Sequence, residues 1–291
     1  MNRRWLLNIA LLVVIGALAL VVVLRPGKRD GDAGGPPLLS LAPEAITQLR
    51  VERPGKETLA FERRGNDWHM TAPHKARAGT FRISELTRLA STRSESSFPA
   101  VEGELARYGL DRPRARVRIN DTEIALGSKH PMRYSQYVRV GDEVHLISAG
   151  SERTLEAPTT DFLSTSLLEE QLKLTALTLP QFALTLDAQG AWTLKPARKD
   201  INADRLTRYV DEWRFARALS AAPYSGAAIR KKVLLRMADD SPIKQIEIGV
   251  LKEKPELLLY RKDEGIEYRF PEETGQRLLE LKPDDAGTPG G

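Results

Sequence analysis

The chain has 291 residues, of which 41% are hydrophobic and 29% are charged, and its formal net charge is +5. This composition is typical of a folded protein that is long enough for two modest domains or one large one, and the mild charge permits anionic partners without requiring them. Cysteine is absent. Its absence excludes disulfides, iron–sulfur clusters, thiol catalysis, cysteine-based zinc sites and the lipidated cysteine of a lipoprotein.

An apolar run at residues 6–24 predicts a transmembrane anchor after a short tail at residues 1–5. Only Asn8 is markedly polar within the run, and a helix of this length spans about 28 Å, close to the ~30 Å hydrocarbon core of a bilayer. A cleaved signal peptide is the alternative, but it would have a shorter apolar region that ends in a small-x-small site. The one such triplet, residues 17–19, lies inside the run, which favours an uncleaved anchor.

The charges that flank the apolar run leave its orientation open. Arg3 and Arg4 favour a cytoplasmic tail, but residues 25–29 are basic as well. A short basic tail before a long body is the usual signal-anchor arrangement, which places the body outside the cytoplasm. If the source is a Gram-negative bacterium, the expected location is the inner membrane, as a single pass, with the body in the periplasm. Glycine, proline and charged residues at 25–40 predict a flexible linker, and residues 282–291 predict a disordered tail.

The body repeats itself at a spacing of about 120–125 residues, which divides it into units at residues 41–170 and 171–281. Alternating apolar residues on both sides of a glycine-containing turn predict a β-hairpin in each unit. Trp68 and Trp192 occupy equivalent places in the two hairpins.

A helix is predicted after each hairpin, with Thr80 capping the first and Asn202 the second. The expected apolar faces are Phe81, Leu86, Leu89 and Ala90 in one helix, and Leu206, Tyr209, Val210 and Trp213 in the other. Further strands are expected at residues 117–119, 124–126, 137–140 and 144–146, and at 233–237, 246–248, 257–260 and 266–270. A short helix near residues 160–168 or 272–281 closes each unit. The predicted fold class is α+β: tandem duplicated β-β-α-β-β-β-β-α units with mainly antiparallel sheets, preceded by one transmembrane helix.

One turn motif occurs only in the first unit. Its residues are Tyr108, Gly109, Leu110, Asp111, Arg112 and Pro113. Gly109 suits the left-handed residue that ends a helix over residues 102–108, and Leu110 is then expected to pack back on Leu105. Pro113 prevents the helix from continuing.

Several of these features together resemble the bacterial domain of unknown function 4340 family. They are the spacing from Trp68 to Pro73, the helix that follows, the Tyr-Gly-Leu-Asp-x-Pro turn, the Leu-Gly strand end at Gly127, and the anchor. The resemblance spans about residues 41–281. The family has no established enzymatic activity and no defined catalytic residues, so the resemblance carries over no site. Some relatives look associated with auxiliary components of ABC-type transport systems, including those linked to gliding motility, which implies an envelope accessory role. Because the second unit lacks the turn, a function that rests on the turn would belong to the first unit alone.

A search for reactive side chains predicts no catalytic, cofactor or metal site. The histidines, none with metal-type spacing, are His69, His74, His130 and His145. His69 and His145 alternate with inward-facing strand residues and are expected to point outward. Residues 241–244 match the S-x-x-K nucleophile motif, but they follow two aspartates in a predicted turn and lack the motif's partners.

Arginines alternate with small or apolar residues along one predicted strand. They are Arg112, Arg114, Arg116 and Arg118, and Arg230, Lys231, Lys232 and Arg236 form a looser counterpart in the second unit. Arg114, Arg116 and Arg118 are candidates for binding phosphate, lipid head groups or an acidic glycan. The alternative is a solvated strand face whose charges discourage edge pairing.

The tryptophans have apolar neighbours at matching period. Trp68, Trp192 and Trp213 are therefore expected to pack in the core, with a ligand groove as the alternative. Nucleic acid is disfavoured as a partner, because no series of aromatic residues accompanies the arginines and the net charge is small.

These observations favour a non-enzymatic membrane-anchored envelope protein that acts as a binding or scaffold module. Its expected partners are the lipid bilayer, through residues 6–24, and an inner-membrane or envelope protein such as a component of an ABC-type transport system. A periplasmic module that binds an anionic ligand or glycan is the alternative, and a hydrolase of unrecognised type is the second. The oligomeric state stays open.

Overall fold

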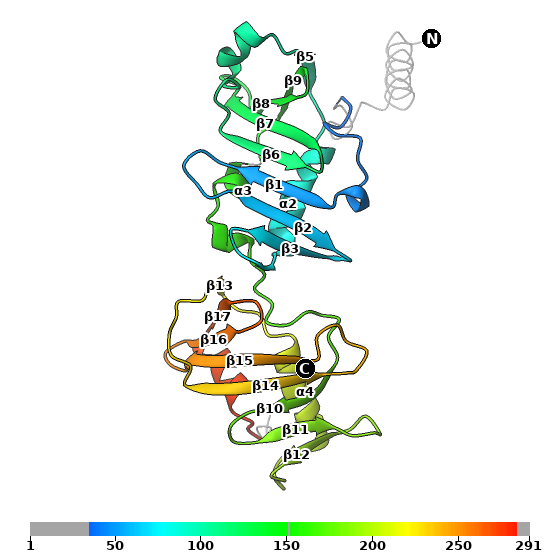
Figure 1. The fold of residues 1–291 in the computed structure, drawn as a ribbon, viewed down its shortest axis with the longest axis vertical. Coiled ribbons are helices and arrows are strands. Elements are labelled where there is room, and N and C mark those ends of the chain that lie inside the picture. Colours follow the sequence, from blue (N-terminus) through cyan, green and yellow to red (C-terminus); the bar gives the residue numbers. More distant parts are fainter. Residues whose placement is uncertain (1–34, 151, 284–291) are drawn as a thin grey trace, which may run out of the picture.

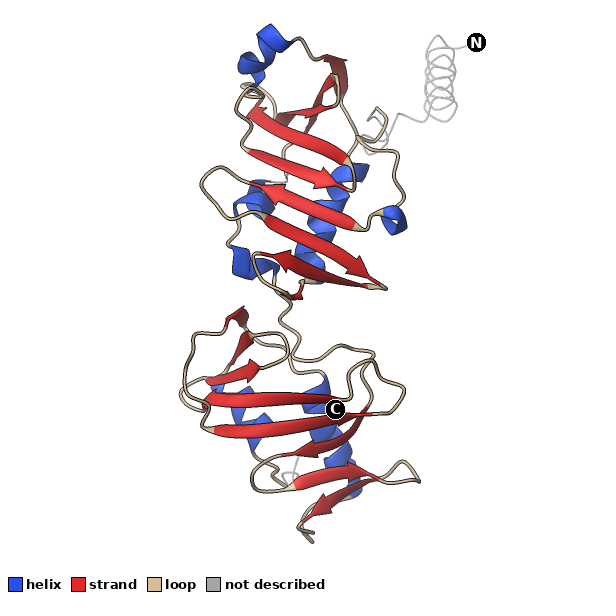
Figure 2. Cartoon of the chain, viewed as in Figure 1, coloured by secondary structure: helices blue, strands red, loops and turns tan. Residues whose placement is uncertain are grey.

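The computed structural model describes residues 35–150 and 152–283, which form an α+β fold of mainly antiparallel sheets (Figure 1 and Figure 2). The predicted tail at residues 1–5 and the predicted anchor at residues 6–24 lie outside this range, as does most of the predicted C-terminal tail. Among the described residues, no helix is long and apolar enough to cross a bilayer.

The first sheet has nine strands in the order β4-β3-β2-β1-β6-β7-β8-β9-β5. Its strands are β1 (Gln48–Glu52), β2 (Leu59–Arg64), β3 (Asp67–Ala72), β4 (Ala76–Arg77), β5 (Ser96–Pro99), β6 (Ala115–Ile119), β7 (Thr122–Lys129), β8 (Ser135–Val140) and β9 (Glu143–Ser148). Each neighbouring pair is antiparallel. The first strand, β1, thus lies in the middle of the sheet. Strands β2–β4 lie on one side of it and β6–β9 on the other.

The second sheet has eight strands in the order β12-β11-β10-β14-β15-β16-β17-β13. They are β10 (Leu174–Thr178), β11 (Ala183–Leu186), β12 (Trp192–Lys195), β13 (Ser220–Pro223), β14 (Lys231–Met237), β15 (Gln245–Lys252), β16 (Leu257–Arg261) and β17 (Ile266–Phe270). This is the strand order of the first sheet without a counterpart of β4. In both sheets the four-residue strand that follows the helix pairs at the outer edge.

Each sheet carries its helices on one face (Figure 2). The helices are α2 (Thr80–Ser91), α3 (Glu152–Glu156), α4 (Ala203–Arg214) and α5 (Glu272–Leu279), with 3₁₀ turns η1 (Pro43–Ala45), η2 (Glu102–Tyr108) and η3 (Thr159–Phe162). The predicted apolar face of α4 is confirmed, because Leu206, Tyr209, Val210 and Trp213 are buried. Tyr209 Oη and Trp213 Nε1 both donate to the Leu278 carbonyl, at 2.6 and 2.9 Å, which ties α4 to α5.

The two helix starts differ in how well the sequence predicts them. Asn202 caps α4 as predicted, since its side-chain oxygen accepts a hydrogen bond of 2.8 Å from the backbone N–H three residues later. The predicted Thr80 cap is wrong: Gly79 is the N-cap of α2, and no side chain caps this helix. Phe81 is also corrected, since it is 68% exposed. Its place on the apolar face belongs to Ile83, because residues two apart on a helix point about 200° away from each other.

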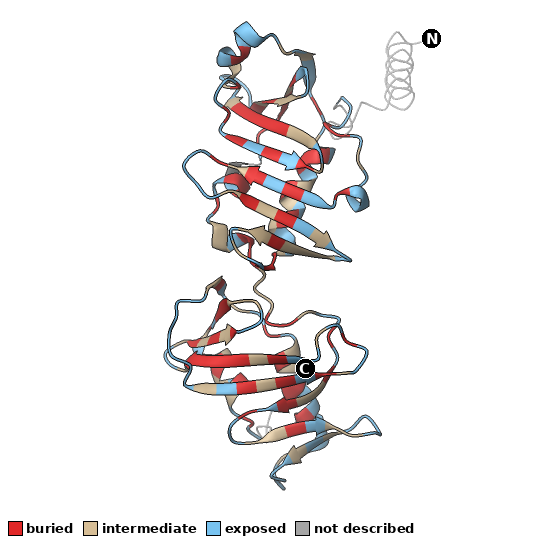
Figure 3. Cartoon of the chain, viewed as in Figure 1, coloured by how far each residue is buried: buried red, intermediate tan, exposed pale blue. Residues whose placement is uncertain are grey.

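Alternating burial explains why these strands form one-sided sheets. Along β6 every second residue is buried and the residues between are exposed, a pattern that Figure 3 shows as alternating bands on β1 and β6. An antiparallel sheet with one face on the core and one in water has this pattern. The arginines of β6 therefore lie on the open face, away from α2.

The structure corrects the predicted order of the elements. The sequence predicts two strands before each helix and four after it, whereas β1 and β10 precede the hairpins and β5 and β13 follow the helices. The edge strands were missed because four residues are too few to show alternation. The helix predicted near residues 160–168 is also wrong: η3 is a single 3₁₀ turn, and extended chain follows it. Its predicted counterpart at residues 272–281 is present as α5.

The predicted flexible linker at residues 25–40 is wrong for the part that the structure describes. Leu38 and Leu39 are each only 7% exposed. Their backbone N–H groups donate to the carbonyls of Thr92 and Ala90, both at 2.9 Å. The chain is therefore fastened to the C-terminal end of α2 before β1 begins.

The turn motif of the first unit adopts the predicted cap. Gly109 has φ of 65°, and the Leu110 N–H donates to the Leu105 carbonyl at 3.0 Å. The helix that it ends is 3₁₀ rather than α. The motif packs on Gly127, which lies inside β7 rather than at its end: a Cβ there would stand 2.3 Å from the Tyr108 carbonyl oxygen. A glycine is therefore required where the turn crosses the sheet.

This close approach predicts the effect of adding one methyl group. Gly127→Ala should lower the free energy of unfolding by about 1–3 kcal/mol, because the Tyr108 carbonyl has to move. Gly103→Ala, in the helix that precedes the motif, is the matched control, since nothing lies within 4 Å of its added Cβ. Urea denaturation of both variants measures the difference, and equal stability would show that the turn does not rest on Gly127.

Candidate functional site

The two sheets are joined by a segment at residues 162–169, which starts at the last residue of η3 and hydrogen-bonds to the chain on both sides. On one side it pairs with the end of β4 and the chain that follows, and on the other with the chain before β13, at N···O distances of 2.7–2.9 Å. These bonds join Phe162 to Gly79, Ser164 to Arg77, Thr165 to Ala218 and Leu167 to Ala216. Phe162 and Leu167 are fully buried and belong to one hydrophobic cluster that includes residues of both sheets. The junction is therefore packed and hydrogen-bonded.

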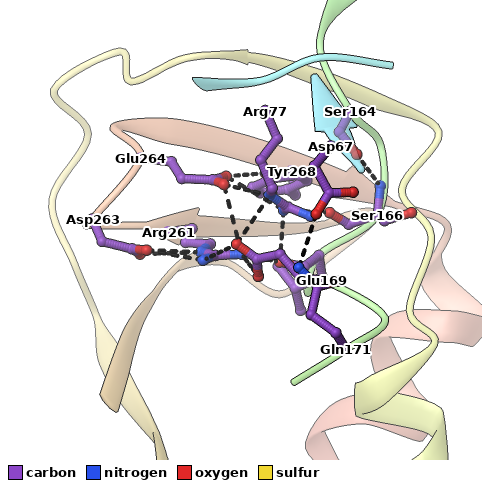
Figure 4. Close-up of polar contacts among 11 residues, drawn as sticks. Asp67, Arg77, Ser164, Ser166, Glu169, Gln171, Arg261, Asp263, Glu264 and Tyr268 are labelled. Carbon is purple, nitrogen blue, oxygen red and sulfur yellow. Dashed lines mark hydrogen bonds and ion pairs between the residues drawn. The ribbon is translucent and has the colours of Figure 1, made fainter. Parts of the chain in front are cut away.

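A buried guanidinium lies at the centre of this junction (Figure 4). Arg261, at the end of β16, has 0% exposure. It binds both carboxylate oxygens of Glu169, with Nη1···Oε2 and Nη2···Oε1 distances of 2.8 and 3.0 Å, and Nη2 also donates to Asp263 at 2.9 Å. A further bond of 2.9 Å from Nη1 reaches the Leu167 carbonyl. One side chain of the second sheet thereby holds the joining segment through its backbone and a carboxylate.

A second arginine enters the same cluster from the first sheet. Arg77, on β4, is 7% exposed and pairs with Glu264 through Nε, while its Nη2 donates to the Ser166 carbonyl at 2.7 Å. Nη2 also donates to Tyr268 Oη at 3.1 Å, and the Tyr268 hydroxyl donates to Glu264 at 2.5 Å. Glu169 lies within 3.5 Å of Arg77 as well. We call Arg77, Glu169, Arg261, Asp263, Glu264 and Tyr268 the junction cluster.

Charge pairing in the junction cluster outweighs burial. Burial alone would lower the pKa of Arg77 and Arg261, but the adjacent carboxylates raise both pKa values above the ordinary range. Burial alone would raise the pKa of Glu169, yet hydrogen bonds from Arg261 and the two positive charges leave it below its ordinary value. Burial and the Glu264 carboxylate together raise the pKa of Tyr268. Both guanidinium groups and Glu169 are therefore charged, and the tyrosine is neutral, at neutral pH.

Beside the junction cluster, the protein surface forms a hollow of about 1400 Å³. Its lining includes the exposed side chains of Phe81 and Leu219, which are 68% and 63% exposed, and the partly buried Trp68. Charged groups on its walls pair with each other, as Arg82 does with Asp161 at 3.1 Å. The hollow thus combines exposed apolar groups with charges that are already balanced. A smaller hollow of about 680 Å³ shares Phe81 and Arg82 with it.

The predicted basic strand has the expected geometry but not the expected charge. Arg116 and Arg118 lie on the open face of β6, as predicted, and Arg114 is exposed just before it. Glu123 contacts both strand arginines, at 3.4 and 3.1 Å, and Glu52 is the cross-strand partner of Arg116. The explanation by edge protection is wrong, because β6 lies between β1 and β7. The strip is a ladder of alternating charges.

The other predicted residues are not brought together into one site. Tyr108 packs between the rings of Phe98 and Tyr137, with centroid distances of 5.2 and 4.9 Å. Leu110 is buried against it, Asp111 is exposed and Pro113 is buried. Trp68 is partly buried on β3, next to the edge strand β4; Trp192 is partly buried on the edge strand β12, and Trp213 is fully buried.

The reactive motifs of the sequence stay apart as well. His69 and His145 do not point fully outward as predicted: both are partly buried, and burial lowers the pKa of each. His145 Nδ1 lies 3.2 Å from Ser94 Oγ. Residues 241–244 form the predicted turn. Within the described ranges, no group of histidine and acidic residues is arranged to hold a metal ion.

The sequence analysis missed the junction cluster, although part of its signal is present. In β16, Leu257, Leu259 and Arg261 alternate on the buried face, so the strand pattern itself places an arginine inside. In β17, Tyr268 lies on the buried face between Ile266 and Phe270. No such pattern marks Arg77 or Glu169, which come from a two-residue strand and an irregular segment.

Removing the central arginine should destabilise the protein strongly. Arg261→Met leaves Glu169 and Asp263 without their partner, and breaking a buried pair costs about 3–5 kcal/mol. Arg269→Met is the matched control, because its ion pair with Glu256 is exposed and should contribute less than about 1 kcal/mol. Guanidinium denaturation at neutral pH measures both, and similar losses for the two variants would contradict the role of the cluster.

The pKa of Glu169 predicts an acid dependence of stability. Because folding lowers this pKa, the stabilisation by Glu169 is complete above its ordinary value of 4.5 and is lost as the pH falls through the lower folded value. The difference in free energy of unfolding between wild type and Glu169→Gln should therefore be largest at neutral pH and shrink below pH 4.5. A difference that stays constant with pH would show that Glu169 is not held as a carboxylate.

Comparison with known proteins adds the family. The family model described as Domain of unknown function (DUF4340) matches residues 68–231, which is more than half of the chain and includes the turn motif and the joining segment. No curated protein and no solved structure matches. The chain belongs to the domain of unknown function 4340 family.

Proposed function

We propose that this protein is a non-enzymatic, membrane-anchored envelope protein that acts as a binding or scaffold module for an inner-membrane complex, such as one of ABC-type transport. The observation that carries the proposal is the hollow at the junction, where Phe81 and Leu219 are exposed beside a rigidly paired charge cluster. Large apolar side chains gathered in one depression are typical of protein-binding surfaces.

The chemistry of the junction cluster supports binding rather than catalysis. Each guanidinium is held by carboxylates or carbonyl groups of the protein itself, and Glu169 is held by two arginines. Charges satisfied in this way position the surrounding backbone, and a reaction would first have to break their bonds. The cluster therefore acts as the support of the adjacent surface.

The charge balance of the hollow favours a protein over an anionic ligand. Arg82 pairs with Asp161, and Arg217 lies 3.8 Å from Glu170. A free anion would have to compete with these carboxylates, whereas a protein surface can bury Phe81 and Leu219 and meet the paired charges at its rim. The anionic-ligand alternative would need Arg116 and Arg118, which contact Glu123.

We also propose that the two sheets are tandem copies of one unit. Their shared strand order supports this. The positions of Gly127 and Gly249 support it as well. Gly127 lies in β7 and Gly249 in the corresponding strand β15. Each is approached by the chain that connects the edge strand, β5 or β13, to the next strand in the sequence, β6 or β14. In the first copy that chain is the Tyr108 turn, and in the second it is Ile229.

Site-specific cross-linking tests the hollow. A photoreactive residue at Phe81 or at Leu219 in the full chain should capture the same membrane protein in intact cells, and Gln189, in an exposed turn of the second sheet, is the control position. Cross-linking from position 219 should fall at least about fivefold when Phe81→Arg places a charge in the hollow. The same product from position 189, or no effect of Phe81→Arg, would contradict docking at this site.

A further inference from the structure

We propose that the tip of the β7–β8 hairpin, residues 129–134, contacts the anionic headgroup layer of the membrane as a second, peripheral attachment of the protein. The inference rests on the proposed function in one respect, because it takes residues 6–24 as a membrane anchor. It concerns residues that do not line the junction hollow.

The composition of the tip is that of an interfacial segment. Its sequence is Lys-His-Pro-Met-Arg-Tyr, with no acidic residue. Met132 is 87% exposed and Tyr134 is 78% exposed, the two largest values among the exposed large hydrophobic residues of the described chain. Arg133 between them is exposed as well. Exposed apolar groups interleaved with basic ones suit the membrane interface, where tyrosine rings and arginine side chains are both stable.

Hydrogen bonds hold the backbone of the tip in place. The His130 N–H donates to the Ser135 carbonyl at 2.8 Å, and the Met132 N–H donates to His130 Nδ1 at 3.2 Å. On the far side, the Tyr134 carbonyl accepts a bond of 3.1 Å from Ala149. The exposure of Met132 and Tyr134 thus comes from an ordered turn, and little conformational entropy is lost when the turn meets a surface.

The tip lies close to the point where the chain enters the described body. Gly35 donates to the Ser94 carbonyl at 2.7 Å, and the next residue, Glu95, accepts from Ser135 Oγ at 2.9 Å. Ser135 directly follows the tip. If the anchor ends at residue 24, the chain from there to Gly35 can extend at most about 40 Å. The end of the body that carries the tip is therefore confined near the bilayer.

The second sheet supplies an internal comparison. Its equivalent hairpin, between β15 and β16, has the tip residues 252–256 when it is also counted from the last residue of the preceding strand, with the sequence Lys-Glu-Lys-Pro-Glu. In this tip two glutamates balance two lysines, and Pro255 is its one apolar residue. Only the hairpin of the sheet that is joined to the predicted anchor is basic and apolar. The tip in the sheet nearer to the predicted anchor along the chain is therefore the one with the composition of a membrane-contacting segment.

The absence of cysteine makes this inference directly testable. Met132→Cys and Lys254→Cys each introduce the sole thiol of the full chain, to be labelled with an environment-sensitive fluorophore and reconstituted into vesicles of phosphatidylcholine and phosphatidylglycerol. The emission at position 132 should shift to the blue and be quenched by nitroxide-labelled lipid. The emission at position 254 should show neither effect. In phosphatidylcholine alone, or after Arg133→Glu, the shift at position 132 should be reduced.

The outcomes separate this inference from the proposed function. If the protein does not float with the vesicles, the prediction of a membrane anchor is wrong, and the proposed function is contradicted. If it floats but positions 132 and 254 behave alike, the membrane contact of the tip is wrong and the anchor stands. A blue shift without lipid quenching would mean that the tip meets protein instead, and an equal shift in both lipid mixtures would overturn the role of the basic residues.

Discussion

Arg261 has no exposed surface, so its charge has to be balanced inside the protein, and the countercharges come from segments that are far apart in sequence. Glu169 belongs to the chain between the sheets, and Asp263 to the turn after β16. Taking an ion out of water costs several kcal/mol, which only a complete set of partners offsets. The cluster is therefore stable in one arrangement: the joining segment lies across β16, and Arg77 brings β4 to the same place. The path of the segment and the walls of the adjacent hollow follow from this.

This dependence explains how far the sequence could predict the molecule. Periodic patterns identified both central helices and most long strands, because Trp213 and its neighbours recur at helical spacing and β6 alternates strictly. The cap at Gly109 was predictable, because a local backbone requirement selects glycine. The junction was not. Arg77 and Glu169 acquire their roles only when β4 and the joining segment meet β16, and no local pattern encodes that meeting. The prediction that Phe81 lies on the apolar face of α2 was wrong for a related reason. The position at which the helix starts decides which of its residues face the sheet, and the sequence pattern did not fix that position.

The two sheets share a strand order but differ in the loops that connect their strands. Gly127 is crossed by the Tyr108 turn, whereas Gly249 is approached only by the Ile229 side chain. The first sheet has a basic and apolar β7–β8 tip, and the second has a charge-balanced one at the same place. A sheet that is held together by backbone hydrogen bonds between its strands tolerates such changes, because loop residues make few of these bonds. Differences between the two sheets are therefore the place to look for function, and the first sheet carries most of them.

The proposed membrane contact of the tip is small, and the anchor makes a small contact sufficient. Partial burial of one methionine and one tyrosine is worth at most a few kcal/mol. For a free protein this would correspond to a dissociation constant in the millimolar range, too weak to matter. In the anchored protein, this dissociation constant has to be compared with the effective concentration of the tip at the bilayer. A short tether makes that concentration millimolar in order of magnitude. The tip would then be bound for a large fraction of the time. Since Tyr134 lines the smaller hollow together with Phe81 and Arg82, that contact would also set how the partner-binding surface is presented above the membrane.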